Sequence, residues 1–238
     1  MEFVQYSLQD GTATIRIDDG KRNALAPAVL KEIYAAFEQA EADRATVILT
    51  GREGVFSAGF DLKVMNRGGP NAIGMLRLGY GLPARVLGFP YPVIAACNGH
   101  SMAMGVFLML SADYIIGSRG DFRIAANEVA IGMTMPRVAA AVMRNRLTPA
   151  AFQRAVTLAE FFDPESARAA GFFDELVEPG ELMARAETLA KQFQELDMHA
   201  HKASKRQERN ALIRRIRRNL PLDLFSAALQ GIRRSRKT

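Results

Sequence analysis

The sequence predicts an α/β fold in which short parallel strands alternate with helices. Apolar runs of about five to eight residues recur along the chain, and most end at a glycine or a turn. Stretches with helical periodicity follow these runs, which is typical of parallel pairing through helical connections. Since no low-complexity linker divides the body, we expect one domain with a helical C-terminal extension.

The chain opens with a hairpin and a helix. Residues 3–8 and 12–17 read as strands, and Asp10–Gly11 between them is a strong hairpin signal. Pro27 suits the first turn of the helix that follows, where apolar residues recur every four positions.

Buried strands are expected next at residues 46–50, 91–98 and 113–118. Residues 103–110 are apolar on every side and predict a buried helix. Residues 71–90 are rich in glycine and proline, so we expect helix fragments in a mobile segment that covers a site.

Prolines in first-turn positions predict three further helices, which begin near Pro136, Pro149 and Pro164. Residues 172–177 read as a strand. From Glu181 to Arg218 the pattern is mostly helical, and Asn219–Pro221 is expected to end it.

Composition excludes several classes of protein. With 49% hydrophobic and 24% charged residues, the 238-residue chain is not expected to be disordered. No apolar run reaches the length of a membrane helix, and the first ten residues do not resemble a secretory signal. The single cysteine, Cys97, excludes a disulfide framework or a multi-cysteine metal site, so a cytoplasmic location is expected.

The net charge of +6 is concentrated near the C-terminus. Residues 201–238 hold twelve Lys or Arg against two acidic residues, whereas residues 1–200 have a net charge of −4. Such a block can bind nucleic acid, an anionic surface, a phosphorylated ligand or another subunit, or form a solvated helical face. Few aromatic residues lie among these cations, so a stacking platform for single strands is not supported.

A faint internal repeat suggests where chemistry could occur. Residues 47–51 lead to 56–62, and residues 93–99 lead to 101–107; each pair is a strand, a glycine, and small residues where a helix begins. A solenoid-like stack of such units would place two helix starts side by side. Two backbone N–H groups could then face one oxygen as an oxyanion hole, although turn geometry alone also explains the pattern.

Glu128 is the candidate base because it lies in the apolar run 125–132, where desolvation would raise its pKa. The alternative is a loop-edge carboxylate that points to water. Asp61 and Asp113 are better explained as caps, and His100 as a turn residue. No phosphate-binding, dinucleotide-binding, serine-hydrolase or zinc-protease motif is present.

Several motifs resemble, in order over roughly residues 1–200, those of the crotonase (enoyl-CoA hydratase/isomerase) superfamily. Residues 56–63, F-S-A-G-F-D-L-K, are similar to its F-x-A-G-x-D-L-K signature. Further matching segments are R-N-A-L at 22–25, P-V-I-A-A-C-N-G at 92–99, S-A-D-Y at 111–114, R-A-A-G at 168–171 and D-E-L-V at 174–177.

The resemblance implies a stacked ββα spiral with a helical C-terminal region. Residues 1–195 would form the core with an acyl-CoA site, and residues 196–238 a basic extension for trimerisation. The implied partners are acyl-CoA thioesters and further copies of the chain, in a homotrimer or dimer of trimers. Coenzyme A would enter as part of the substrate, so no cofactor, metal or membrane span is implied. Nucleic-acid binding is not expected.

The resemblance also assigns the site. The backbone N–H groups of Phe60 and Met104 would form the oxyanion hole, and the CoA-binding loop would comprise Ala58, Gly59, Asp61 and Leu62. The family commonly has three glycines where this chain has residues 103–105, Ala-Met-Gly, which would narrow the pocket. Methionines that could line an acyl pocket or pack in the core are Met65, Met75, Met102, Met104, Met133 and Met135.

The most informative departure is Phe107, which stands where hydratases of this family carry one of two glutamates. The second is retained in Asn127–Glu128, a pair that resembles the single-glutamate enoyl-CoA isomerases. One carboxylate can move a proton from C2 to C4, whereas hydration also needs an oriented water. The sequence therefore favours a 3-ene to 2-ene isomerase in which Phe107 and Asn127 line the substrate site.

Two alternatives stay open. The chain could be a hydratase-like lyase or acyl-CoA hydrolase that uses water held by Glu128. It could also be a catalytically silent scaffold that binds acyl-CoA or RNA through its basic extension.

Overall fold

A computed structural model describes residues 1–235 and confirms the α/β class. Its main sheet has the strand order β1-β2-β4-β7-β9-β11. Only β1 and β2 pair antiparallel, across the expected hairpin, and the other neighbours pair in parallel. The strands are β1 (Val4–Gln9), β2 (Thr12–Ile17), β4 (Thr46–Thr50), β7 (Val93–Cys97), β9 (Tyr114–Ser118) and β11 (Glu175–Val177).

Shorter strands lie between the main strands in the sequence. They pair with one another, so that successive units of the repeat stack. The three-stranded sheet has the order β10-β8-β5, and β3 pairs with β6. Gly54 lies opposite Gly99 in this sheet, and a Cβ on Gly99 would clash with the backbone of Gly54. The strands are β3 (Ala24–Leu25), β5 (Gly54–Ser57), β6 (Gly59–Phe60), β8 (Gly99–Met102) and β10 (Ile124–Ala125).

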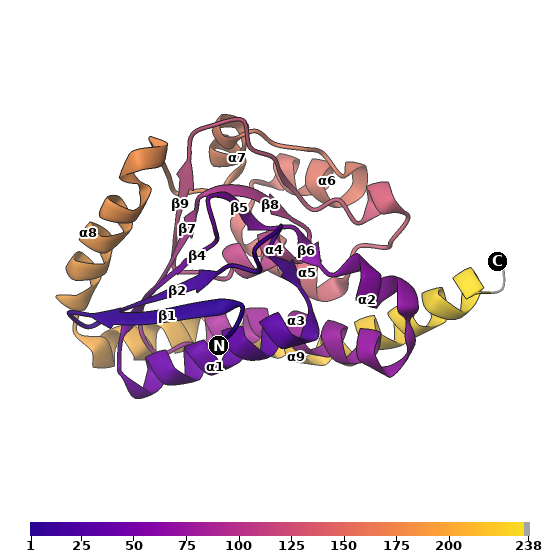
Figure 1. Ribbon diagram of the computed structural model, residues 1–238, viewed down its shortest axis with the longest axis horizontal. Helices are drawn as coiled ribbons and strands as arrows, with labels where there is room; N and C mark the ends of the chain where they lie inside the picture. The colour runs from indigo at the N-terminus through magenta and orange to yellow at the C-terminus, as the bar shows by residue number, and fades with distance from the viewer. Residues whose placement is uncertain (236–238) are drawn as a thin grey trace.

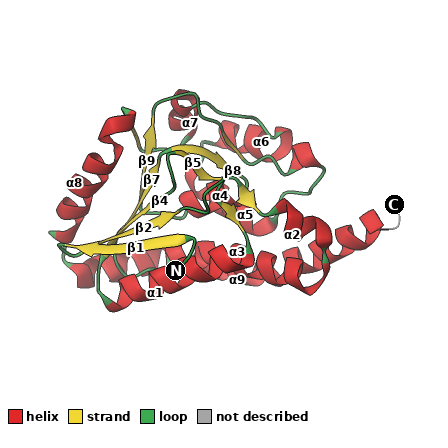
Figure 2. Ribbon diagram, viewed as in Figure 1, coloured by secondary structure: helices red, strands yellow, loops and turns green. Residues whose placement is uncertain are grey.

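Helices cover both faces of the main sheet (Figures 1 and 2). On one face, α8 (Leu182–Gln194) packs Leu182, Ala186 and Leu189 against Ile48 and Ile94. On the other, α1 (Pro27–Ala42) and α3 (Gly69–Leu87) enclose the larger core. The long helix α9 (Met198–Ser235) packs on α3 and α5 (Arg137–Arg146). Strands β4, β7 and β9 are continuous apolar runs because helices cover both faces of the sheet at these strands.

The remaining helices largely begin where the sequence predicts. Thr148 caps α6 and Asp163 caps α7, each through its side chain, and proline is the first residue of both helices. Gly171 ends α7 in the left-handed conformation. These shorter elements are α2 (Leu62–Arg67), α4 (Met104–Met109), η1 (Val129–Ile131), α6 (Pro149–Leu158), α7 (Pro164–Ala170) and η2 (Pro179–Glu181).

The expectation of helix fragments in residues 71–90 was wrong. Helix α3 is continuous over 19 residues, and its glycines are positions of close approach. The Phe60 ring lies where a Cβ on Gly79 would be, and the Tyr34 hydroxyl lies 3.0 Å from a Cβ position on Gly81. Burial of one face of the helix outweighs the weak helix propensity of these glycines.

The expected helix end at Asn219–Pro221 was also wrong, because α9 continues through Pro221. Asp223, two residues later, is 4% exposed and accepts N–H groups of Arg137 and Val138 at 3.0 and 2.8 Å. It thereby caps the start of α5 from another helix, and this docking compensates for the helix bond that proline cannot make. The strand expected at 172–177 shortens to β11, since Phe172 and Phe173 pack in the core.

Part of the basic extension is used inside the fold. Lys205 lies 2.6 Å from Asp113 and Arg209 lies 2.9 Å from it, so two cations of α9 anchor the helix to the sheet. Burial lowers the pKa of Lys205 to about 8. Asp113 also accepts the N–H of Val93, which makes it a strand anchor rather than a helix cap. Arg236 and Lys237 lie outside the described residues.

Across the described part of the chain, no helix combines the length and apolar character needed to cross a membrane.

Replacing Asp223 by asparagine tests the docking of α9. The Asp223→Asn change removes the charge that pairs with Arg137 and replaces one acceptor at the start of α5 by a donor. We expect the free energy of unfolding, measured by urea denaturation, to fall by about 1–3 kcal/mol. Asp121→Asn, at an exposed position, should change it by less than about 0.5 kcal/mol. Equal stability of the two variants would contradict this role.

Candidate active site

A buried asparagine holds the first of the two strand-to-helix turns. The side-chain amide of Asn23 donates to three backbone carbonyls, those of Ile17, Val55 and Phe56, at 2.8–3.2 Å. The Ser57 hydroxyl donates to the carbonyl of Asn23 at 2.8 Å and accepts the N–H of Gly59 at 3.1 Å. The turn before Phe60 is therefore rigid, because both of its sides are bonded to the segment around Asn23.

The two turns of the internal repeat touch each other. Gly59 has φ +83°, and a Cβ on it would lie 2.9 Å from the Cβ of Ala103 and 3.3 Å from the backbone nitrogen of Met104. A Cβ on Gly105 would lie 2.7 Å from the carbonyl oxygen of Ser57. Met104 is the first residue of α4, so its N–H has no partner within that helix. Glycine at two positions thus brings this N–H next to the Gly59–Phe60 peptide.

Ala103 adopts a backbone conformation that favours glycine, with φ 48° and ψ −122°. Its N–H donates to the carbonyl of Ala125 in the adjacent strand β10 at 2.8 Å. This bond connects the second turn to the segment that contains Glu128.

Glu128 is buried, and one of its carboxylate oxygens accepts no hydrogen bond from the described residues. It is 5% exposed, and its Oε2 has no hydrogen-bond partner among the described residues. Burial raises its pKa to about 7, against a smaller opposing effect of its own backbone N–H. In the described chain the other buried carboxylate is Asp223, whose two oxygens both accept hydrogen bonds. Glu128 is therefore the buried carboxylate that can exchange a proton near neutral pH.

Tyr80 connects the first turn to Glu128 and was missed by the sequence analysis. Its ring meets that of Phe60 edge to face, with centroids 5.5 Å apart. Burial raises the pKa of its hydroxyl, and the charges of Glu128 and Asp223 raise it further, so the phenol stays protonated. Tyr80 lies in α3, in the segment where helix fragments were expected. The helical periodicity of that segment was therefore not used to place Tyr80 on a buried face.

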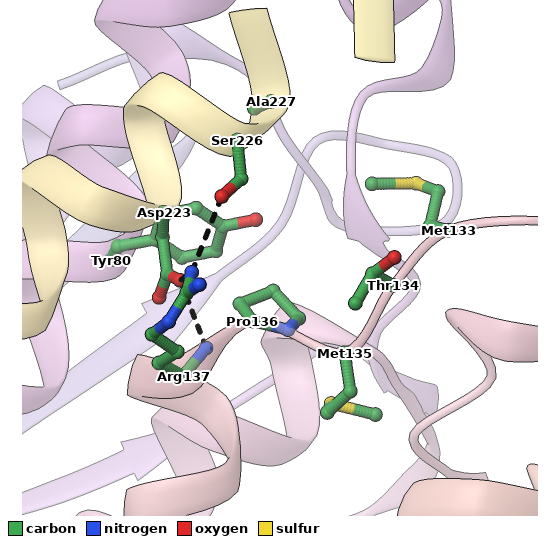
Figure 3. A pocket seen from close by; sticks show the side chains of 9 residues that line it. All are labelled: Tyr80, Met133, Thr134, Met135, Pro136, Arg137, Asp223, Ser226 and Ala227. Atoms are coloured by element: carbon green, nitrogen blue, oxygen red, sulfur yellow. Dashed lines mark hydrogen bonds and ion pairs between the residues drawn. The ribbon is translucent and has the colours of Figure 1, made fainter. Parts of the chain in front are cut away.

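A cavity of about 330 Å³ lies beside Tyr80 (Figure 3). Its walls come from α3, from the segment that precedes α5, and from α9. The lining residues are Tyr80, Met133, Thr134, Met135, Pro136, Arg137, Asp223, Ser226 and Ala227. Of the candidate pocket methionines, Met133 and Met135 line this cavity, whereas Met75 and Met104 are completely buried in the core.

The other candidate residues are divided between the loop and the core. The Asp61 carboxylate caps α2 by accepting two backbone N–H groups, at 2.7 and 3.2 Å, while Ala58 is half-buried and Leu62 exposed on the same loop. Asn127 is half-buried beside Glu128. Phe107 is 1% exposed, inside the main core, and supplies no carboxylate.

The described residues contain no group of three or more His, Cys, Asp or Glu side chains that could hold a metal ion. The arrangement instead offers one titratable carboxylate near two adjoining turns, which suits proton transfer at a bound carbonyl compound.

Comparison with known proteins decides the family. Residues 7–228 match the family model described as enoyl-CoA hydratase/isomerase. The chain belongs to the enoyl-CoA hydratase/isomerase family. As the sequence motifs predicted, this family member has the crotonase fold, a stacked ββα spiral with a helical C-terminal region.

Relatives of this family member carry both activities in their names. A crystal structure of an enoyl-CoA hydratase/isomerase family protein from Pseudomonas syringae is 45% identical, with a TM-score of 0.91, over 93% of this chain and 96% of that one. An apo structure from Mycobacterium tuberculosis that is called an enoyl-CoA isomerase is 43% identical, with a TM-score of 0.88, over 92% of this chain and 96% of that one. Another structure of the same protein, 41% identical with a TM-score of 0.91, is called a probable enoyl-CoA hydratase. The "Probable enoyl-CoA hydratase echA17" of Mycobacterium avium is 30% identical over 86% of this chain and 82% of its own.

Glycine at position 103 should stabilise the protein. The Ala103→Gly change removes the steric cost of a Cβ at φ 48°, so we expect the free energy of unfolding to rise by about 1 kcal/mol. Urea denaturation measures this change. Ala140→Gly, inside helix α5, is the matched control and should lower stability by about 1 kcal/mol. A loss of stability in Ala103→Gly would show that the Cβ makes favourable contacts that outweigh the strain.

The raised pKa of Glu128 predicts how stability depends on pH. The folded state holds the proton more tightly than the unfolded chain, so this residue costs stability as pH rises from about 4.5 to about 7. Glu128→Gln cannot ionise, and its stability relative to the native protein should improve by about 1–3 kcal/mol between pH 4 and pH 8. Urea denaturation across this range measures the difference. A constant difference would mean that Glu128 titrates at its ordinary pKa.

Proposed function

We propose that this protein is an enoyl-CoA isomerase that moves a double bond from C3 to C2 of an acyl-CoA thioester. The observation that carries the proposal is the buried carboxylate of Glu128, whose Oε2 is unpaired among the described residues and whose pKa is about 7. Phe107, at the position where the sequence resemblance places a second hydratase glutamate, supplies no group that could orient water.

The proposed reaction begins when ionised Glu128 removes a proton from C2. The electron pair moves toward the thioester carbonyl, and the resulting dienolate oxygen accepts hydrogen bonds from the N–H groups of Phe60 and Met104. Glu128 then returns the same proton at C4, which leaves the double bond between C2 and C3. No water, redox partner or further cofactor enters this balance, since coenzyme A is part of the substrate.

The supporting geometry is the contact between the two turns. Gly59 adjoins the nitrogen of Met104, and Ala103 is bonded to Ala125, three residues before Glu128. The edge-to-face contact of Phe60 with Tyr80 places aromatic surface near the carboxylate. An apolar environment strengthens the hydrogen bonds to the dienolate and disfavours competing hydration.

The loop of Ala58, Gly59, Asp61 and Leu62 is proposed to bind the CoA portion, with Asn127 and Phe107 beside the acyl portion. We further propose that residues 196–238 mediate assembly into a homotrimer or a dimer of trimers. Leu222, Phe225 and Leu229 support this proposal because they are exposed on α9 at helical spacing. Light scattering coupled to gel filtration measures the mass of the assembly.

Hydration of enoyl-CoA is the second candidate function, since a relative that is 30% identical is named a probable enoyl-CoA hydratase. It differs from the first in one measurable respect, because it requires net addition of water to a 2-enoyl-CoA.

Turnover of 3-hexenoyl-CoA and 2-hexenoyl-CoA tests the proposal. We expect isomerisation of the first to exceed hydration of the second, and Glu128→Gln to lower kcat by about 10²- to 10⁴-fold. In the native enzyme kcat/KM should rise with pH and level off above about 7, because the base must be ionised.

The matched control is Glu187→Gln, which removes an exposed carboxylate on α8 and should leave turnover unchanged. Hydration at a rate comparable to isomerisation would support the hydratase. Unchanged turnover in Glu128→Gln would remove Glu128 from the mechanism, and no turnover of either compound would favour a binding scaffold.

A further inference from the structure

The cavity beside Tyr80 is more polar than a plain hydrocarbon chain requires. Its lining combines two methionines, a proline and an alanine with the hydroxyl-bearing residues Tyr80, Thr134 and Ser226. The Tyr80 hydroxyl points into the space between α9 and the segment 133–137 (Figure 3). An aliphatic chain packed against the Tyr80 hydroxyl would desolvate this group without offering it a hydrogen bond, which costs binding free energy.

The guanidinium of Arg137 lies at the edge of this cavity, and some of its N–H groups donate no hydrogen bond to a described residue. Nη1 of Arg137 lies 3.1 Å from Oδ1 of Asp223 and 3.2 Å from Oγ of Ser226. The side chain is 53% exposed, and within the described residues its Nε and Nη2 have no hydrogen-bond partner. Arginine can bind one carboxylate with one part of its planar fork while another part stays free for a second anion.

The neighbouring charge of Asp223 is already compensated. Its two oxygens accept the N–H groups of Arg137 and Val138, at the positive end of the ten-residue helix α5, in addition to the guanidinium. A second carboxylate that binds Arg137 would therefore experience little repulsion from Asp223, because the charge of Asp223 is compensated by these donors. Glu128 is the other acid whose charge acts on Tyr80, and it is not among the residues that line the cavity.

We propose that the cavity accepts acyl chains that end in a carboxylate, which the free donors of Arg137 bind, with the Tyr80 hydroxyl as a second polar contact. This inference rests on the proposed function, because it takes an acyl-CoA as the substrate. The substrate class is then the CoA monothioester of an unsaturated dicarboxylic acid. The apolar residues of the lining contact the methylene groups between the thioester and the carboxylate.

Binding of saturated CoA thioesters tests the proposal without depending on turnover. Calorimetry compares dicarboxylic monothioesters of six, eight and ten carbons with the matching fatty acyl-CoAs and with chains that end in a hydroxyl. We expect at least one length at which the carboxylate binds about tenfold more tightly than the methyl-ended chain. Equal affinities at every length would overturn the proposal, and so would equal binding of the hydroxyl-ended chain.

Variants locate the effect. Arg137→Gln should reduce the preference to below about threefold, and Arg137→Lys should retain only part of it, because lysine keeps the charge but loses the planar fork. Arg217→Gln, which removes an exposed cation from α9, is the matched control and should keep the full preference. Circular dichroism checks the fold of each variant. A preference that survives in folded Arg137→Gln would exclude Arg137 as the binding group and overturn the proposal.

Failure of this inference is distinguishable from failure of the proposed function. The corresponding 3-enoyl compounds give kcat/KM for both chain types. Isomerisation of 3-hexenoyl-CoA with no gain from a terminal carboxylate overturns only the substrate class. Carboxylate-selective binding that depends on Arg137, without isomerisation of any compound, supports the cavity assignment and contradicts the isomerase.

Discussion

The contact between two strand-to-helix turns is the constraint on which the rest of the site depends. Gly59 and Gly105 have no side chains, so the backbone after β5 can lie against the backbone after β8. Asn23 and Ser57 then fix one turn by hydrogen bonds, and the bond from Ala103 to Ala125 fixes the other. Because the repeat stacks its strands in parallel, both turns lie at the same edge, and β10, which precedes Glu128 in the chain, is hydrogen-bonded to the second turn.

The second half of the site is built by elements far apart in the sequence. Tyr80 belongs to α3, Arg137 to α5 and Asp223 to α9, and the cavity exists only where these three helices meet. The ion pairs of Lys205 and Arg209 with Asp113 hold one part of α9, and the bonds of Asp223 to α5 hold another. The turns therefore belong to the stacked core, whereas the wall of the cavity belongs to a docked helix.

Local signals predicted much of the fold and the burial of Glu128. The hairpin, the buried strands, the proline-led helices and the burial of Glu128 could be predicted because each depends on neighbouring residues. The predictions for helix α3 and for the end of α9 were wrong because burial against distant elements outweighed the low helix propensity of glycine and proline. Tyr80 and Asp223 could not be found in this way, since their roles come from partners such as Phe60 and Arg137 that no sequence interval links.

The position of α9 after all the strands in the sequence has a consequence for folding during synthesis. Strands β1 to β9 can pair as they leave the ribosome, because each contacts segments already made. The wall formed by Asp223, Ser226 and Ala227 follows every strand of the sheet in the sequence, so the cavity stays open to water until α9 docks. A chain that has formed its sheet but not docked α9 would thus expose the faces of α3 and α5 that α9 covers, and such exposed surface promotes aggregation.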